Sequence, residues 1–192
     1  MRTAVFIDGG YMDRVSRSLG SPRIDYGLLV REMAQGDLLR AYYYHCLPYV
    51  GVPAAPEDEE RRAGKERFFN ALSRLPQFQV REGVLQFYGR DEGSKRPIYI
   101  QKRTDVLLTM DLMNLTLKGR LSRAVLMAGD SDLVPIVQAV KAEGVTVHLF
   151  HGEANLMPNR DLWEAADERT VVTHALFHRA LAAEPGRHAA PA

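Results

Sequence analysis

Short apolar, β-branched runs alternate with segments of helical periodicity along most of the chain. Such alternation is typical of βα units, which build a mostly parallel sheet covered by helices. The predicted strands cover residues 3–8, 39–47, 77–81, 123–128, 145–150 and 170–172. The predicted helices follow the first strand directly and then cover residues 25–36, 57–75, 104–118, 131–143, 158–166 and 174–183. The pattern therefore predicts an α/β fold with a mostly parallel central sheet.

One segment departs from this alternation. Two runs with strand periodicity, Val84 to Arg90 and Pro97 to Gln101, are separated by a short polar stretch, so we predict a β-hairpin arm over residues 84–101. The sequence contains no internal repeat, and we predict a single domain over residues 1–183. Residues 184–192 are rich in Pro, Gly and Ala and are predicted to be a disordered tail.

Composition narrows the class of protein. The chain has 192 residues, of which 46% are hydrophobic and 26% charged, and these values exclude wholesale disorder and a collagen-like repeat. No apolar run approaches the roughly 20 residues needed to cross a bilayer, so we expect a cytoplasmic protein. The single cysteine, Cys46, lies in an apolar run and is predicted to be a buried, inert thiol.

Charge is unevenly distributed although the formal net charge is only +1. Residues 61–123 contain 14 Lys and Arg against 6 Asp and Glu, which gives +8 and leaves 11 minus 18, or −7, for the rest of the chain. A basic middle segment beside acidic flanks is typical of a polyanion-binding surface next to an acidic pocket. The alternative is that the charged stretch over residues 57–65 is merely the solvated start of a helix.

Several aspartates follow predicted strands. Asp8 ends the first strand, and Asp130 and Asp132 follow the strand over residues 123–128. Ligands of parallel sheets bind beyond the carboxyl ends of the strands, where the strand order reverses. If these two strands are neighbours, their carboxylates converge and repel one another unless a cation neutralises them. Each aspartate alone could instead cap a helix, but the pair at Asp130 and Asp132 exceeds what one cap needs.

The helix over residues 104–118 contributes a further carboxylate. Apolar residues at helical spacing predict this helix, and Asp105 lies in its first turn, where the helix dipole also favours an anion. An ion pair with Lys102 is the alternative role for Asp105. Asp111 lies six residues further on, about 240° round the helix, and is a second-tier candidate. Carboxylate donors without a histidine or cysteine motif favour Mg²⁺ or Mn²⁺ over zinc.

Three motifs together resemble the NYN domain family (LabA-like) of the PIN-like nuclease superfamily. The motifs are Phe6-Ile7-Asp8-Gly9-Gly10-Tyr11, Lys102-Arg103-Thr104-Asp105-Val106 with Asp111, and Gly129-Asp130-Ser131-Asp132-Leu133. The resemblance covers about residues 3–173 and implies a three-layer α/β/α PIN-like fold. It also implies divalent-metal-dependent ribonuclease activity, with Asp8, Asp105, Asp130 and Asp132 as catalytic and metal-binding residues. Tyr11 departs from the family, which often has Asn at this position.

The expected reaction is metal-assisted hydrolysis of RNA phosphodiester bonds, which needs no side-chain nucleophile. Lys102 is predicted to bind the scissile phosphate and Arg103 to follow the RNA backbone. Ser131 is predicted to orient a carboxylate or a water, and its alternative role is to cap its helix. Tyr11 is predicted to stack on a base of single-stranded RNA, and the alternative is that this tyrosine, which opens a helix, is packed inside the fold. Other basic residues predicted to follow the backbone are Arg61, Arg62, Lys65, Arg67, Lys95 and Arg96.

The sequence does not decide between catalysis and binding alone. The same acidic crevice would also fit a catalytically inactive metal- or nucleotide-binding regulatory module. A phosphatase of the haloacid dehalogenase type is disfavoured, because Gly10 stands where such an enzyme needs a second aspartate. The sequence also leaves open whether the chain forms a homodimer.

Overall fold

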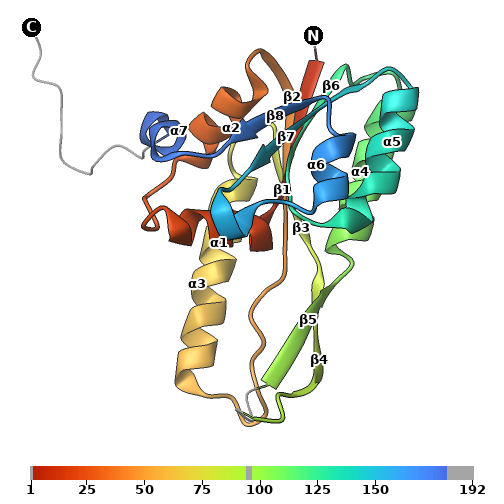
Figure 1. Ribbon diagram of the computed structural model, residues 1–192. Coiled ribbons are helices and arrows are strands. Elements are labelled where there is room, and N and C mark those ends of the chain that lie inside the picture. Colours follow the sequence, from red (N-terminus) through yellow and green to blue (C-terminus); the bar gives the residue numbers. More distant parts are fainter. Residues whose placement is uncertain (1, 94–96, 181–192) are drawn as a thin grey trace, which may run out of the picture.

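The central feature of the computed structural model, which describes residues 2–93 and 97–180, is a six-stranded sheet (Figure 1). The strand order is β3-β2-β1-β6-β7-β8, and every neighbouring pair is parallel. The strands are β1 (Arg2–Asp8), β2 (Asp37–His45), β3 (Phe78–Glu82), β6 (Arg123–Met127), β7 (Thr146–His151) and β8 (Glu168–Val171). The predicted α/β fold with a mostly parallel sheet is confirmed.

The strand order reverses between β1 and β6. From β1 the chain adds β2 and β3 on one side, then returns to β6 on the other side and continues outward through β7 and β8. Ile7 and Met127 are register partners near the carboxyl ends of these two strands. The condition set by the sequence is therefore met, because the strands that precede Asp8 and Asp130 are neighbours at the switch point.

Helices cover both faces of the sheet. They are α1 (Gly9–Ser18), α2 (Tyr26–Ala34), α3 (Pro56–Ser73), α4 (Thr104–Leu117), α5 (Val134–Ala142), α6 (Arg160–Ala165) and α7 (His174–Arg179). Successive residues of β1 point to opposite faces, as strand geometry requires. Val5 and Ile7 join an apolar core with α1, α2, α3 and α7, whereas Ala4 and Phe6 join a second core with α4, α5 and α6. The two cores make a three-layer α/β/α arrangement.

The predicted arm is also confirmed. Strands β4 (Val84–Arg90) and β5 (Pro97–Lys102) pair antiparallel as a separate two-stranded sheet. Figure 1 shows this arm and α3 extending from the same end of the central sheet.

Some boundaries differ from the predictions. The predicted helix over residues 131–143 begins as a 3₁₀ turn at Ser131–Leu133, because Asp130 caps the turn and Pro135 lies in the first turn of α5. The last helix, α7, ends at Arg179, and the predicted tail over 184–192 lies outside the described residues. Within the ranges described above, no helix has both the length and the apolar character that membrane crossing requires.

Candidate functional site

A cleft of about 500 Å³ opens at the switch point between β1 and β6. Three of the predicted aspartates, Asp8, Asp105 and Asp130, line it together with Ser131. The remaining lining residues are Gly10, Arg14, Thr104, Gly129 and Asn159. The fold thus brings residues from β1, α4 and the segment after β6 to one place.

Asp8 and Asp130 each cap the helical turn that follows them in the sequence. Asp8 caps α1, and its Oδ1 accepts hydrogen bonds from the backbone amides of Gly10 (2.9 Å) and Tyr11 (3.2 Å). Asp130 Oδ1 accepts from the backbone amide of Asp132 at 3.0 Å. The capping role is therefore real, but it uses one oxygen of each carboxylate. Neither Oδ2 atom has a hydrogen-bond partner among the described residues.

Asp105 is the least compensated carboxylate of the cleft. It lies in the first turn of α4, after Arg103, whose φ of 76° is in the left-handed region that non-glycine residues rarely adopt. Among the described residues, no hydrogen bond or ion pair involves the Asp105 carboxylate. Burial raises the pKa of Asp105, and the negative charges of Asp8, Asp130 and Asp132 raise it further. The alternative role of Asp105, an ion pair with Lys102, is not found among the described residues.

The electrostatics of Asp8 follow the same pattern. Burial raises the pKa of the Asp8 carboxyl above its ordinary value, although the amides of Tyr11 and Gly10 and the charge of Arg14 act in the opposite direction. Carboxylates in such surroundings are stabilised by any cation that enters the cleft.

The other predicted site residues take different places. Asp132 is exposed and does not line the cleft, but its charge acts on Asp105. Lys102 and Arg103 are exposed and directly precede Thr104, which lines the cleft, so they form a basic rim beside it. Of the further basic residues, Lys95 and Arg96 lie outside the described residues, while Arg61, Arg62 and Lys65 each form an ion pair with a carboxylate of this chain.

Asp111 has a structural role. Its carboxylate accepts two hydrogen bonds from Arg81, from Nε at 2.8 Å and from Nη2 at 2.9 Å. The Tyr44 hydroxyl donates a third at 3.1 Å. Asp111 does not line the cleft, so it has a different role from Asp105 although both lie on α4.

The prediction that Tyr11 stacks on a base is wrong. Tyr11 is only 2% exposed, its hydroxyl donates to the carbonyl of Leu156 at 2.6 Å, and it accepts from the amide of Gly152 at 3.0 Å. Its ring packs on Gly129 so closely that a Cβ there would lie 2.6 Å from Tyr11 Cε2. Tyr11 therefore positions the glycine that precedes Asp130.

Sequence reasoning missed two polar residues of the cleft. Arg14 follows Gly10 by one helical turn, so the helical period of α1 alone places it on the face that points to the cleft. Asn159 caps α6, and its backbone amide donates to the carbonyl of Gly129 at 2.9 Å. No local signal in the sequence reveals that second contact, because it joins segments that only the tertiary fold brings together.

The donor chemistry of the cleft fits a hard divalent cation. Carboxylate oxygens are the ligands that Mg²⁺ and Mn²⁺ prefer. As placed, no three His, Cys, Asp or Glu side chains within residues 2–93 and 97–180 are grouped so that they could hold one metal ion. This arrangement is compatible with Mg²⁺, which usually keeps several waters and takes only one or two carboxylates directly.

Comparison with known proteins identifies the family. A family model described as NYN domain matches residues 2–173. A crystal structure of a protein of unknown function from Vibrio parahaemolyticus is similar to this chain, with a TM-score of 0.57, 18% sequence identity, and coverage of 90% of this chain and 93% of that one. At this identity the similarity establishes a shared fold. Among curated proteins, none matches this chain.

Proposed function

The chain belongs to the NYN domain family of the PIN-like nuclease superfamily, and we propose that it is a divalent-metal-dependent ribonuclease acting at the acidic cleft. NYN domains are generally nucleases, and the family suggests RNA as the substrate. The observation that carries the proposal is Asp105, a partly buried carboxylate that has no cationic partner among the described residues and lies in the field of three other aspartates.

Three aspartates outside the cleft, in contrast, have cationic partners. Asp13, Asp111 and Asp167 each form an ion pair with a lysine or arginine at 2.8–3.1 Å. The aspartates of the cleft have no such ion pair among the described residues. Unpaired carboxylates in a confined space are costly unless a cation from solution neutralises them. The cleft is therefore built for a ligand with positive charge.

The residues of the cleft divide the chemistry among them. One or two of the carboxylates of Asp105, Asp8 and Asp130 would bind the cation directly, and the remaining one would act on it through its water ligands. When bound, Mg²⁺ or Mn²⁺ lowers the pKa of a water ligand and stabilises charge on the leaving oxygen. The Arg14 guanidinium is suited to bind a phosphate oxygen of the substrate. Ser131 orients a neighbouring carboxylate or water, and Lys102 and Arg103 hold the RNA backbone at the rim.

Cleavage of an unstructured RNA in Mn²⁺ and in EDTA tests the proposal. Asp8→Asn is the test variant and Asp25→Asn is its matched control, because Asp25 also caps a helix through its carboxylate but does not line the cleft. Asn caps helices as well as Asp, so both variants are expected to fold. The wild type and Asp25→Asn should cleave only in Mn²⁺, and Asp8→Asn should be slower by about a hundredfold or more.

The rival function, an inactive metal- or nucleotide-binding module, makes the opposite prediction. Such a module shows no metal-dependent turnover in the wild type or in either variant. That result, obtained with protein that binds Mn²⁺, would overturn the proposal.

A further inference from the structure

A second cavity, of about 520 Å³, lies between α3 and the β4–β5 arm. Gly64, Lys65 and Phe68 line it from α3, and Leu85 lines it from β4. Cys46 and Leu47, which follow β2, complete this part of the wall. The arm is thus one wall of a cavity, a role that its separate two-stranded sheet does not reveal by itself.

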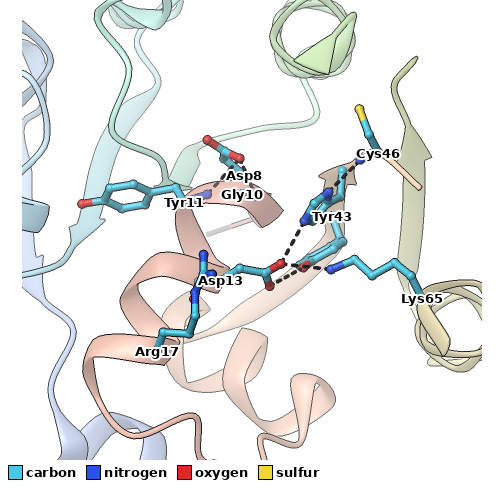
Figure 2. A network of polar contacts seen from close by, with 9 residues as sticks. Asp8, Gly10, Tyr11, Asp13, Arg17, Tyr43, Cys46 and Lys65 are labelled. Carbon is cyan, nitrogen blue, oxygen red and sulfur yellow. Dashed lines mark hydrogen bonds and ion pairs between the residues drawn. The ribbon is translucent and has the colours of Figure 1, made fainter. Parts of the chain in front are cut away.

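A polar network marks the end of this cavity nearest to α1 (Figure 2). Asp13 Oδ2 lies 3.1 Å from Lys65 Nζ and 2.9 Å from His45 Nε2. The backbone amide of Cys46 donates to His45 Nδ1 at 2.7 Å, so the ring proton is on Nε2 and is donated to Asp13. Burial acts to raise the pKa of Asp13, but the hydrogen bond from His45 and the charge of Lys65 lower it. Asp13 is therefore a fixed anion.

The remaining wall is largely apolar and aromatic. Tyr26 and Phe68 both line the cavity and pack edge to face, with ring centroids 5.3 Å apart. Ligand sites for small organic groups have volumes of about 300–1,000 Å³ and combine such surfaces with a few placed polar groups. An unpaired nucleobase needs this combination, an apolar or aromatic surface for its face and a hydrogen-bond acceptor for an exocyclic amino group. The Asp13 side chain is 40% exposed and retains lone pairs for that bond.

His45 and Cys46 line the second cavity and also lie close to residues of the acidic cleft. Gly9, the residue after Asp8, packs against the His45 ring so closely that a Cβ would lie 2.6 Å from Cδ2. Burial raises the pKa of the Cys46 thiol, and the charges of Asp105 and Asp8 contribute to the shift. Both observations put the wall of the second cavity next to the aspartates of the cleft.

We propose that the second cavity binds one unpaired base of an RNA whose neighbouring phosphate lies in the acidic cleft. The inference rests on the proposed ribonuclease function and adds to it a reason for selecting single-stranded RNA. A base within a duplex is stacked and paired, so neither its faces nor its Watson–Crick edge is available to the cavity. The cavity therefore rejects duplex RNA, whose bases cannot enter it.

Filling the cavity at Gly64 tests the proposal. A Cβ at Gly64 would meet only Arg67 Nη2, at 3.8 Å, so Gly64→Leu adds a side chain to the cavity wall without displacing the backbone. Removing a glycine from the middle of α3 also favours the helix, so the variant should be at least as stable as the wild type. Ala71→Leu is the matched control, because Ala71 is an exposed residue of the same helix that does not line the cavity.

The readout is affinity for a short unstructured RNA, measured by fluorescence anisotropy in EDTA so that no turnover occurs. Gly64→Leu should weaken binding by about tenfold or more, as expected for loss of one stacked base, while Ala71→Leu stays within about twofold. A series of RNAs with one abasic position should show a similar loss in the wild type at a single position, and no further loss in Gly64→Leu. Equal affinities for all proteins and all RNAs would overturn the proposal.

The outcome separates this proposal from the ribonuclease function. If Gly64→Leu binds normally while the wild type cleaves RNA in Mn²⁺, the base cavity is refuted and the nuclease stands. If the wild type never cleaves but binding depends on one base and on Gly64, the nuclease is refuted and the cavity stands.

Discussion

Two aspartates near the start of α1 lie in opposite environments. Asp13 is bonded to the cationic side chain of Lys65 and to His45, and these partners lower its pKa. Asp8 caps the same helix, and burial raises its pKa. Helix α1 thus has one carboxylate that is neutralised by its partners and one that forms no ion pair among the described residues.

Helix α4 repeats the contrast. Asp111 forms a two-pronged ion pair with Arg81, whereas Asp105, in the first turn of the same helix, is surrounded by other aspartates. Paired carboxylates hold elements together, and unpaired ones in a cleft are typical of a binding or catalytic site. Both aspartates belong to the same sequence motif, so the presence or absence of a cationic partner indicates the role of each better than the motif does.

The largest expected effect is on catalysis. Asp105→Asn should reduce Mn²⁺-dependent RNA cleavage by about a hundredfold or more, because it removes a charge that the cation needs. Asp111→Asn, on the same helix, should keep the rate within a few fold. Single-turnover cleavage of one labelled RNA measures both. Equal losses in the two variants would contradict the division of roles along α4.

The next largest effect is on stability, and for this property Asp111 should matter more than Asp105. Asp111→Ala should lower the free energy of unfolding by about 1–3 kcal/mol, because Arg81 and the buried Tyr44 hydroxyl lose their acceptor. Asp105→Ala should not lower it, since no described residue depends on that carboxylate. Urea unfolding in EDTA measures the difference, and a stable Asp111→Ala variant would show that its ion pair is incidental.

A smaller effect concerns pH. Because the pKa of Asp105 is raised above 3.8 in the folded state, the native state binds this proton more tightly than the unfolded state. The free energy of unfolding therefore falls as pH rises from about 3.8 through the raised pKa. Asp105→Asn removes that loss and should raise the melting temperature at pH 7 in EDTA. The corresponding gain in the free energy of unfolding should be at most about 1 kcal/mol, because the carboxyl group is only partly buried.

The same measurement has an internal control. Below the ordinary pKa of 3.8, Asp105 is protonated in both states, so the advantage of Asp105→Asn should vanish there. Saturating Mn²⁺ should raise the melting temperature of the wild type more than that of the variant. A stability difference that does not change with pH would show that the charge of Asp105 is not its cause.

The sequence predicts those parts of the molecule that rest on local patterns. Alternating periodicity identifies the strands and helices, and strand ends identify Asp8 and Asp130 as candidates. The neighbouring positions of β1 and β6 could be stated only as a condition, because strand order depends on contacts between distant segments. Tyr11 was misjudged because its sequence position next to Asp8 does not reveal that its ring packs inward on Gly129.

The second cavity shows the same limit. Lys65 was predicted to contact RNA on charge alone, but in the fold it is paired with Asp13. Nothing in the sequence indicates that α3 and β4 face each other across a cavity, since their separation along the chain carries no periodic signal. Local chemistry is therefore readable from the sequence, whereas the partner of each charged group is decided by the tertiary structure.

The smallest expected effect concerns the two arginines of α1. Arg14 lines the acidic cleft, and its charge opposes the raised pKa of Asp8, whereas Arg17 is exposed one turn later and donates from Nε to the backbone carbonyl of Asp13. Arg14→Gln should weaken RNA binding several-fold and reduce the slope of log affinity against log salt by about 0.7, the value for one phosphate contact to a single strand. Arg17→Gln should change neither quantity. If Arg14→Gln keeps the full slope, the arginine serves Asp8 alone, and the substrate phosphate is held by the cation and the rim residues instead.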